Sequence, residues 1–196
     1  MKRPPKDITL ERFFTDWLPS ELGGQTAPAP LHARVVVVGD GDGERGGVWD
    51  LHVGPDGLRV TAPNGAEPPV TVKLGVSDWR GVVLGDGPAG TLAPPDASPA
   101  DLMLLDATAR DLVKTAKGIV RFEVADVGFA ATLKLGTGPM GPPDATVVTD
   151  ATTYADLLAR RVPLAQAYFQ GRIRLTGDVN LAMQLGMALM TTQRFG

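Results

Sequence analysis

The sequence contains no cysteine and only two histidines among its 196 residues. The absence of thiols excludes a disulfide framework, a cysteine-ligated zinc or iron–sulfur site, and a thiol nucleophile. Two imidazoles give too few ligands for a histidine-based metal site, and none of the serines stands in a nucleophile elbow. The sequence therefore predicts a protein that is not an enzyme and that holds no metal or cofactor.

Excess charge and long apolar runs are also missing. The chain has 19 lysines and arginines against 22 acidic residues, a formal net charge of −3, which excludes the basic footprint of a nucleic-acid-binding protein. No apolar segment follows the basic start Met1–Lys6, and the longest mostly apolar stretch, Leu181–Met190, is about half a membrane span. We expect a cytoplasmic protein without stable membrane insertion.

Glycine and proline are abundant, with 24 and 17 residues, whereas 43% of the chain is hydrophobic. This balance predicts a folded core crossed by many turns. Short alternating runs separated by turn residues favour antiparallel hairpins, and runs with helical spacing lie between them. The predicted strands are Arg34–Val38, Val48–Val53, Leu58–Thr61, Val70–Leu74, Ile119–Val124, Phe129–Leu135, Ala145–Val148 and Arg172–Thr176. The predicted helices are Thr9–Leu18, Asp101–Lys117, a helix capped by Asp150, Pro163–Tyr168 and a last helix from Asp178 to about Thr192.

The order of elements restarts along the chain. A shift of 75 residues places Pro68 on Pro143, Trp79 on Tyr154 and Pro88 on Pro163 without a gap. A repeated order at a fixed period argues for two copies of one unit. We divide the chain into residues 1–30 (helix and linker), 31–117 (a degenerate unit) and 118–196 (a fuller unit), with one composite domain of both units as the alternative.

The first predicted helix has an aromatic face. Phe13, Phe14 and Trp17 recur at helical spacing, and Pro19 is expected to stop the helix. The face is expected to dock on the core, and the alternative is a surface that binds a protein partner.

Two further patterns resemble sites without meeting their requirements. The G-x-G-x-x-G run Gly41–Gly46 leads directly into the strand at Val48, so it predicts a glycine-rich hairpin loop instead of a dinucleotide fingerprint. His32 lies beside the linker, and His52 shares a strand face with Asp50; both histidines are expected at the surface.

The last predicted helix is apolar on two sides, because a leucine stripe and a methionine stripe run along it. Such a helix is either buried between layers or walls a cavity. Just before it, the run Ala167–Met183 resembles the A-F-x-x-G-K-[IL]-K-[IL]-x-G-[DN] signature of the sterol carrier protein 2 (SCP2) family, with Arg172 and Arg174 at the lysine positions. The segments 143–147 and 154–158 are similar to the family's P-D-A-T segment, and 47–51 with 69–72 resemble its first half.

The resemblance implies an α+β fold in which helices cover an antiparallel sheet and enclose an apolar cavity for a sterol, fatty acyl chain or similar lipid. It leads us to expect a non-catalytic lipid-binding or lipid-transfer protein. The alternative is an accessory module of a lipid pathway whose apolar groove or N-terminal helix binds a partner. An enzyme would become the better reading if a polar pocket converged on Asp50, His52 and Arg59. The candidate lipid-binding residues are Phe122, Phe129, Leu133, Tyr154, Leu157, Leu158, Phe169, Ile173, Leu185 and Met187.

Overall fold

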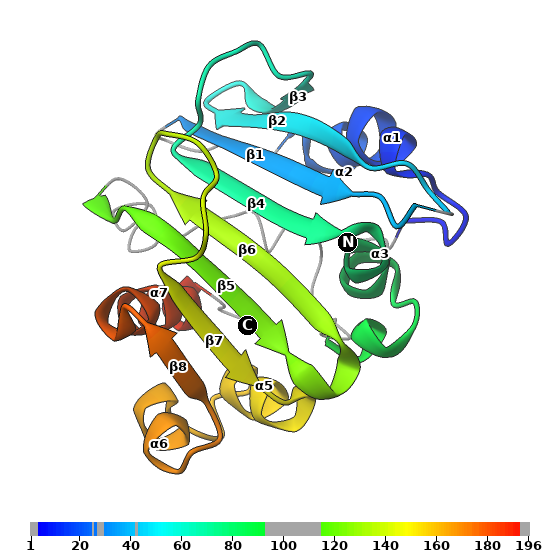
Figure 1. Ribbon diagram of the computed structural model, residues 1–196. Helices are drawn as coiled ribbons and strands as arrows, with labels where there is room; N and C mark the ends of the chain where they lie inside the picture. The colour runs from blue at the N-terminus through cyan, green and yellow to red at the C-terminus, as the bar shows by residue number, and fades with distance from the viewer. Residues whose placement is uncertain (1–3, 25, 27–29, 42, 93–114, 193–196) are drawn as a thin grey trace.

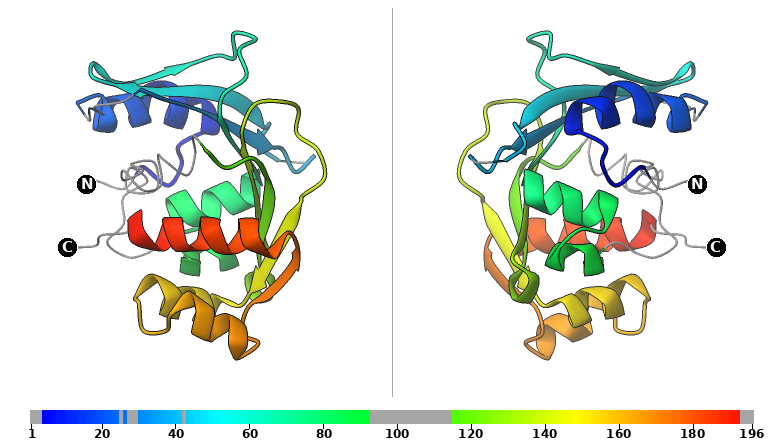
Figure 2. Two further views of the ribbon diagram at one scale, coloured as in Figure 1. Left: turned by 90° about the vertical axis from the view of Figure 1, so that its left-hand side faces the viewer. Right: turned by 90° about the vertical axis from the view of Figure 1, so that its right-hand side faces the viewer.

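The computed structural model describes the chain except for residues 1–3, 25, 27–29, 42, 93–114 and 193–196. The described strands form one eight-stranded sheet in the order β3-β2-β1-β4-β6-β5-β7-β8 (Figure 1). The described helices lie against one face of this curved sheet, and none of them lies on the other face, here called the helix-free face (Figure 2). The predicted α+β class is confirmed.

Most predicted elements are present, with boundaries shifted by a few residues. The strands are β1 (Leu31–Val38), β2 (Gly47–Gly54), β3 (Gly57–Thr61), β4 (Val70–Gly75), β5 (Gly118–Val124), β6 (Phe129–Leu135), β7 (Ala145–Thr149) and β8 (Arg174–Gly177). The helices are α1 (Leu10–Arg12), η1 (Phe13–Trp17), α2 (Leu18–Leu22), α3 (Val76–Leu84), η2 (Pro88–Leu92), η3 (Ala125–Val127), α5 (Ala151–Leu158), α6 (Leu164–Phe169) and α7 (Val179–Thr192). The predicted helix Asp101–Lys117 lies almost wholly outside the described residues.

The two halves of the sheet pair their strands in the same way. β1 is antiparallel to β2 and parallel to β4, and β5 is antiparallel to β6 and parallel to β7. A single antiparallel pairing, β4 with β6, joins the halves into one sheet. The sheet is therefore mixed, with two parallel pairs among the hairpins that the turn pattern predicts.

The N-terminal helix is longer than the sequence predicts. Of the two N-cap candidates in the sequence, Asp7 and Thr9, Thr9 caps the helix by accepting a hydrogen bond from the Arg12 amide. Pro19, however, does not stop the helix, which continues to Leu22. Ahead of the proline the turn η1 is a π-helix, closed by the Leu18 amide on the Phe13 carbonyl, and a wider turn accommodates a ring that would clash with an α-helical carbonyl.

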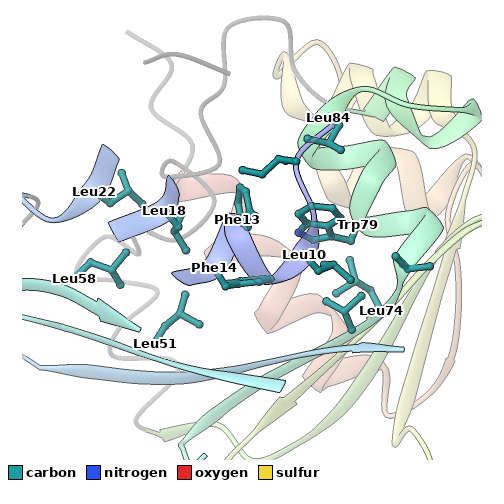
Figure 3. Close-up of a cluster of buried hydrophobic side chains, with 13 residues drawn as sticks. Leu10, Phe13, Phe14, Leu18, Leu22, Leu51, Leu58, Leu74, Trp79 and Leu84 are labelled. Atoms are coloured by element: carbon teal, nitrogen blue, oxygen red, sulfur yellow. The ribbon is translucent and has the colours of Figure 1, made fainter. Parts of the chain in front are cut away.

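The aromatic face of this helix is buried in the protein's own core (Figure 3). Phe13 and Phe14 are each 1% exposed, and the Phe14 ring stacks on Trp49 of β2 at 4.2 Å between centroids. Phe13 meets Trp79 of α3 edge to face at 5.1 Å. Phe13 and Phe14 therefore offer no free surface to a partner, because β2 and α3 already cover them.

The C-terminal helices begin where the sequence predicts. The Asp150 carboxylate accepts hydrogen bonds from the amide of Thr153 at 2.7 Å and from its hydroxyl at 2.8 Å, which starts α5. Asp178 accepts from the Leu181 amide at 3.0 Å, which starts α7. Capping of the otherwise unpaired first-turn amides explains why both helices begin at these aspartates.

Candidate functional site

The predicted lipid-binding residues lie on the helix-covered side of the C-terminal half, but in separate clusters. Phe122 of β5, Phe129 of β6 and Tyr154 of α5 belong to one of them. Their rings are close, with centroids 6.3 Å apart for Phe122 and Phe129 and 5.8 Å apart for Phe122 and Tyr154.

A second cluster lies under α7. Leu185 of α7 is 8% exposed and packs with Leu181 over the central strands, where half-buried Leu133 of β6 joins them. Leu157 of α5 and Ile173 form a third cluster, 4% and 3% exposed, and Leu158 next to Leu157 is half-buried.

Two of the predicted residues point to solvent. Phe169, the last residue of α6, is 84% exposed, and Met187 of α7 is 53% exposed. Their helices touch, because a Cβ added to Gly186 of α7 would lie 2.7 Å from a Leu164 methyl group of α6. Both side chains are therefore exposed apolar groups on two touching helices, and together we call them the exposed rim.

Tyr154 brings a polar group to the aromatic cluster. Its side chain is half-buried, burial raises the pKa of its phenol, and its hydroxyl makes no hydrogen bond to any residue that the structure describes. A phenol in such surroundings is a hydrogen-bond donor available to a ligand.

The helix-free face of the sheet carries a polar cluster that the sequence did not predict. His32 is in β1, which begins three residues earlier than predicted, and lies directly opposite His52 of β2 in the antiparallel register. The two rings stack with centroids 4.2 Å apart and planes inclined by 21°. Asp50 lies two residues before His52 and so points to the same face.

Asp50 is the buried centre of this cluster. Its side chain is 0% exposed and forms a two-point ion pair with Arg34, whose Nε donates to Oδ1 at 2.6 Å and whose second guanidinium nitrogen donates to Oδ2 at 2.9 Å. These hydrogen bonds hold the pKa of the Asp50 carboxyl below its usual range and outweigh the opposing effect of burial. The carboxylate is therefore ionised at neutral pH.

The two imidazoles are poorly satisfied. His32 Nε2 is buried and lies 3.4 Å from Asp50 Oδ2, yet it has no hydrogen-bond partner within the described part of the chain. His52 Nε2 lies 3.4 Å from the Thr61 hydroxyl, and burial lowers the pKa of His52. An imidazole nitrogen of His32, an imidazole nitrogen of His52 and a carboxylate oxygen of Asp50 all lie within 4.8 Å of one another.

A pocket of about 280 Å³ adjoins the cluster and shares Arg34 with it. Lys73 and Lys134 supply two further cations, and Glu67 supplies a carboxylate that accepts a hydrogen bond from the Gly138 amide at 2.5 Å. Arg59, opposite His52 in the register of β2 and β3, is exposed. The lining of this pocket contains neither Asp50, His52 nor Arg59, so the polar pocket that would favour an enzyme is not found at these three residues in the described part of the chain.

Among the described helices, none combines the length and apolar character that a membrane crossing requires.

Comparison with known proteins finds a family match in the C-terminal half and several solved structures that are similar over part of the chain. The model of the SCP-2 sterol transfer family matches residues 100–190. The apo form of sterol carrier protein 2 from Yarrowia lipolytica is 16% identical over 62% of this chain and 98% of its own, with a TM-score of 0.36. The sterol carrier protein domain 2 of Helicoverpa armigera is 22% identical over 50% of this chain and 88% of its own, with a TM-score of 0.35.

An alkylsulfatase also shares a small part of its structure with this chain. The sec-alkylsulfatase Pisa1 from Pseudomonas sp. is 24% identical over 36% of this chain, which spans only 12% of that enzyme, with a TM-score of 0.30. No curated protein matches the chain. The resemblance that the motif at residues 167–183 predicts is therefore confirmed: residues 100–190 match the SCP-2 sterol transfer family.

Proposed function

We propose that this protein is a non-catalytic lipid-binding or lipid-transfer protein, and that its C-terminal half holds the apolar part of the lipid on the helix-covered side of the sheet. The observation that carries the proposal is the match of residues 100–190 to the SCP-2 sterol transfer family. The ligand we propose is a sterol, a fatty acyl chain or a similar apolar molecule.

The packing of the central strands supports this location. Phe122 and Leu133 of the sheet face the helices, and Tyr154 of α5 faces the sheet, yet all three stay half-buried. By contrast, Val120 and Val124 on either side of Phe122 are 3% and 0% exposed. A chain of about 16 methylenes buried there would gain roughly 13 kcal/mol at ~0.8 kcal/mol each. Association of the lipid with the protein and ordering of its chain cost about 4–15 kcal/mol, which offsets part of this gain. Burial of the chain alone is therefore enough for micromolar affinity.

The exposed rim gives the ligand a route. Phe169 and Met187 lie on two touching helices beside the third cluster, so an acyl chain leaving a membrane would meet apolar side chains first. In the proposal these two residues guide the lipid, and the half-buried residues hold it.

The Tyr154 hydroxyl, which has no hydrogen-bond partner among the described residues, suits a lipid that carries a hydroxyl or carboxylate group. One hydrogen bond of this kind contributes about 0.5–1.5 kcal/mol, or roughly 2–10-fold in affinity. Tyr154→Phe should therefore weaken binding of a sterol or fatty acid by that factor and leave binding of a plain alkyl chain unchanged.

The decisive experiment fills the proposed site. Leu133→Trp adds an indole to a half-buried position under the C-terminal helices, and Val60→Trp makes a similar change at a half-buried position of β3 in the N-terminal cluster. We expect the first variant to lose at least 10-fold in affinity for a fluorescent fatty acid and the control to bind normally. Equal affinity of both variants, or native mass spectra of the purified protein without any lipid, would refute the proposal.

No observation favours the accessory module over this proposal. The aromatic residues that suggested a partner surface contribute to the core, and removing residues 1–22 would open that core instead of testing a docking helix.

A further inference from the structure

We propose that His32, Asp50 and His52 form a binding site for one divalent first-row metal ion of the zinc class, on the face of the sheet that carries none of the described helices. The site lies on the opposite side of the sheet from the proposed lipid site and is independent of the proposed function.

The backbone brings the three side chains together. Residues directly opposite on antiparallel strands have Cβ atoms about 4.5–5.5 Å apart, which places His32 and His52 side by side. Asp50 follows on the same face because side chains alternate along β2. The site is therefore a consequence of the β1–β2 register and needs no loop to close it.

The chemistry of the three groups suits such an ion. Two imidazole nitrogens and one carboxylate oxygen are ligands that zinc and its neighbours accept. Zinc–ligand bonds of about 2.0–2.1 Å in a tetrahedron put ligand atoms about 3.4 Å apart. The 3.4 Å between His32 Nε2 and Asp50 Oδ2 already has this spacing, so side-chain rotation of His52 completes the set.

The unsatisfied nitrogen of His32 is the independent sign of a ligand. A buried ring nitrogen without a hydrogen-bond partner is costly, and a bound ion or water is a usual explanation. Trp79 Nε1 is also buried and unpaired, but it lies in the aliphatic and aromatic core cluster, whereas His32 faces a carboxylate and a second imidazole.

The neighbouring side chains set the expected affinity for the metal ion, and the number of protein ligands leaves one coordination position open. Arg34 holds Asp50 in place as a second-sphere partner, and the Thr61 hydroxyl does the same for His52. The Arg34 charge offsets that of Asp50, so the affinity should be micromolar, below that of all-thiolate structural sites. Three protein ligands leave a position for water or an anion, as in catalytic zinc sites.

The two histidines make the test direct, since they are the only imidazoles and the chain has no thiol. Zn²⁺ added to the EDTA-stripped full-length protein should bind with a stoichiometry of one by calorimetry. It should shift the NMR signals of both imidazoles together, and Co²⁺ should give visible absorption of low-symmetry coordination.

The variants separate a built site from casual binding. The double variant His32→Asn with His52→Asn should lose at least 100-fold in Zn²⁺ affinity while its circular dichroism stays native, and Asp56→Asn, an exposed carboxylate of the β2–β3 turn, should bind like the wild type. Zn²⁺ shifting one imidazole alone, or binding with unchanged affinity to the double variant, would overturn the proposal. Asp50→Asn is unsuitable as the sole test, because it leaves Arg34 without its charge partner.

Discussion

Replacing Phe14 by alanine tests whether the N-terminal helix is part of the core. Phe14 is 1% exposed and packs between Trp49 at 4.2 Å and Phe13 at 5.0 Å between ring centroids. Phe-to-Ala changes in closed cores lower the free energy of unfolding by about 3–5 kcal/mol. Each aromatic pair also stabilises the fold beyond what its buried area contributes. We expect Phe14→Ala to lower the free energy of unfolding by about 4 kcal/mol, a large share of a domain's ~5–15 kcal/mol.

The assay is urea unfolding followed by two signals. All three tryptophans of the chain, Trp17, Trp49 and Trp79, lie in or against this one cluster, so tryptophan fluorescence reports it alone, whereas far-ultraviolet circular dichroism reports every helix and strand. If the free energy of unfolding falls by about 2 kcal/mol per molar urea, the urea concentration at the unfolding midpoint should fall by about 2 M. Thr15→Ala, an exposed change on the same helix, should stay within about 0.5 kcal/mol of the wild type.

A loss below about 1 kcal/mol for Phe14→Ala, no larger than that of the control, would show that the helix is a detachable appendage. That result would refute the packing argument and restore the aromatic face as a candidate partner surface. A tryptophan transition that precedes the circular dichroism transition would show instead that the N-terminal cluster unfolds before the rest of the sheet.

Three further predictions concern the C-terminal half. Asp150→Ala should cost about 1 kcal/mol by removing the cap on the Thr153 amide. Because those hydrogen bonds lower the pKa of Asp150, its contribution is complete above the unfolded-state pKa and disappears as pH falls through the lower folded-state pKa; Asp150→Asn should keep the cap and lose this acid dependence in urea titrations. Gly177 and Gly171 both have positive φ, 78° and 71°, but a Cβ at Gly177 would collide with the carbonyl oxygen of Asp144, whereas Gly171 faces open space. Gly171→Ala should therefore cost about 1 kcal/mol and Gly177→Ala clearly more, and equal losses in thermal unfolding would contradict this. Phe169→Ser should leave stability within about 0.5 kcal/mol, because the ring is 84% exposed, yet slow lipid transfer between vesicles; an unchanged rate would remove Phe169 from the proposed route.

The sequence predicts strands and helix starts well, because these are encoded locally. Alternation and turn residues place β6 at its observed bounds, Phe129–Leu135, and the aspartates at 150 and 178 mark where α5 and α7 begin. The helix α3 was not predicted, because Gly81 interrupts its pattern. That glycine is required by packing: a Cβ there would lie 2.5 Å from the Ala89 Cβ of η2.

The candidate site is harder to predict, because it depends on which strands become neighbours. Nothing local shows that His32 lies opposite His52, and the run of valines begins at Val35, three residues after His32, so the predicted strand does not reach the histidine. Likewise, periodicity marks Phe169 and Met187 as apolar positions, but their exposure depends on how α6 and α7 are placed. The division of the predicted lipid residues into clusters follows from helix docking, not from their order in the chain.

The pairing of β4 with β6 has a consequence for any attempt to study the halves apart. Val70–Leu74 and Ala131–Leu135 provide each other's backbone partners along the whole joint, so cutting the chain between them would leave two unprotected strand edges. An isolated C-terminal half would present β6 as a ready template for another chain, and self-association of that fragment would then reflect the cut instead of a native oligomer. The two halves therefore serve as each other's edge protection, and a deletion that keeps only the family-matching residues removes the neighbour that keeps them from associating.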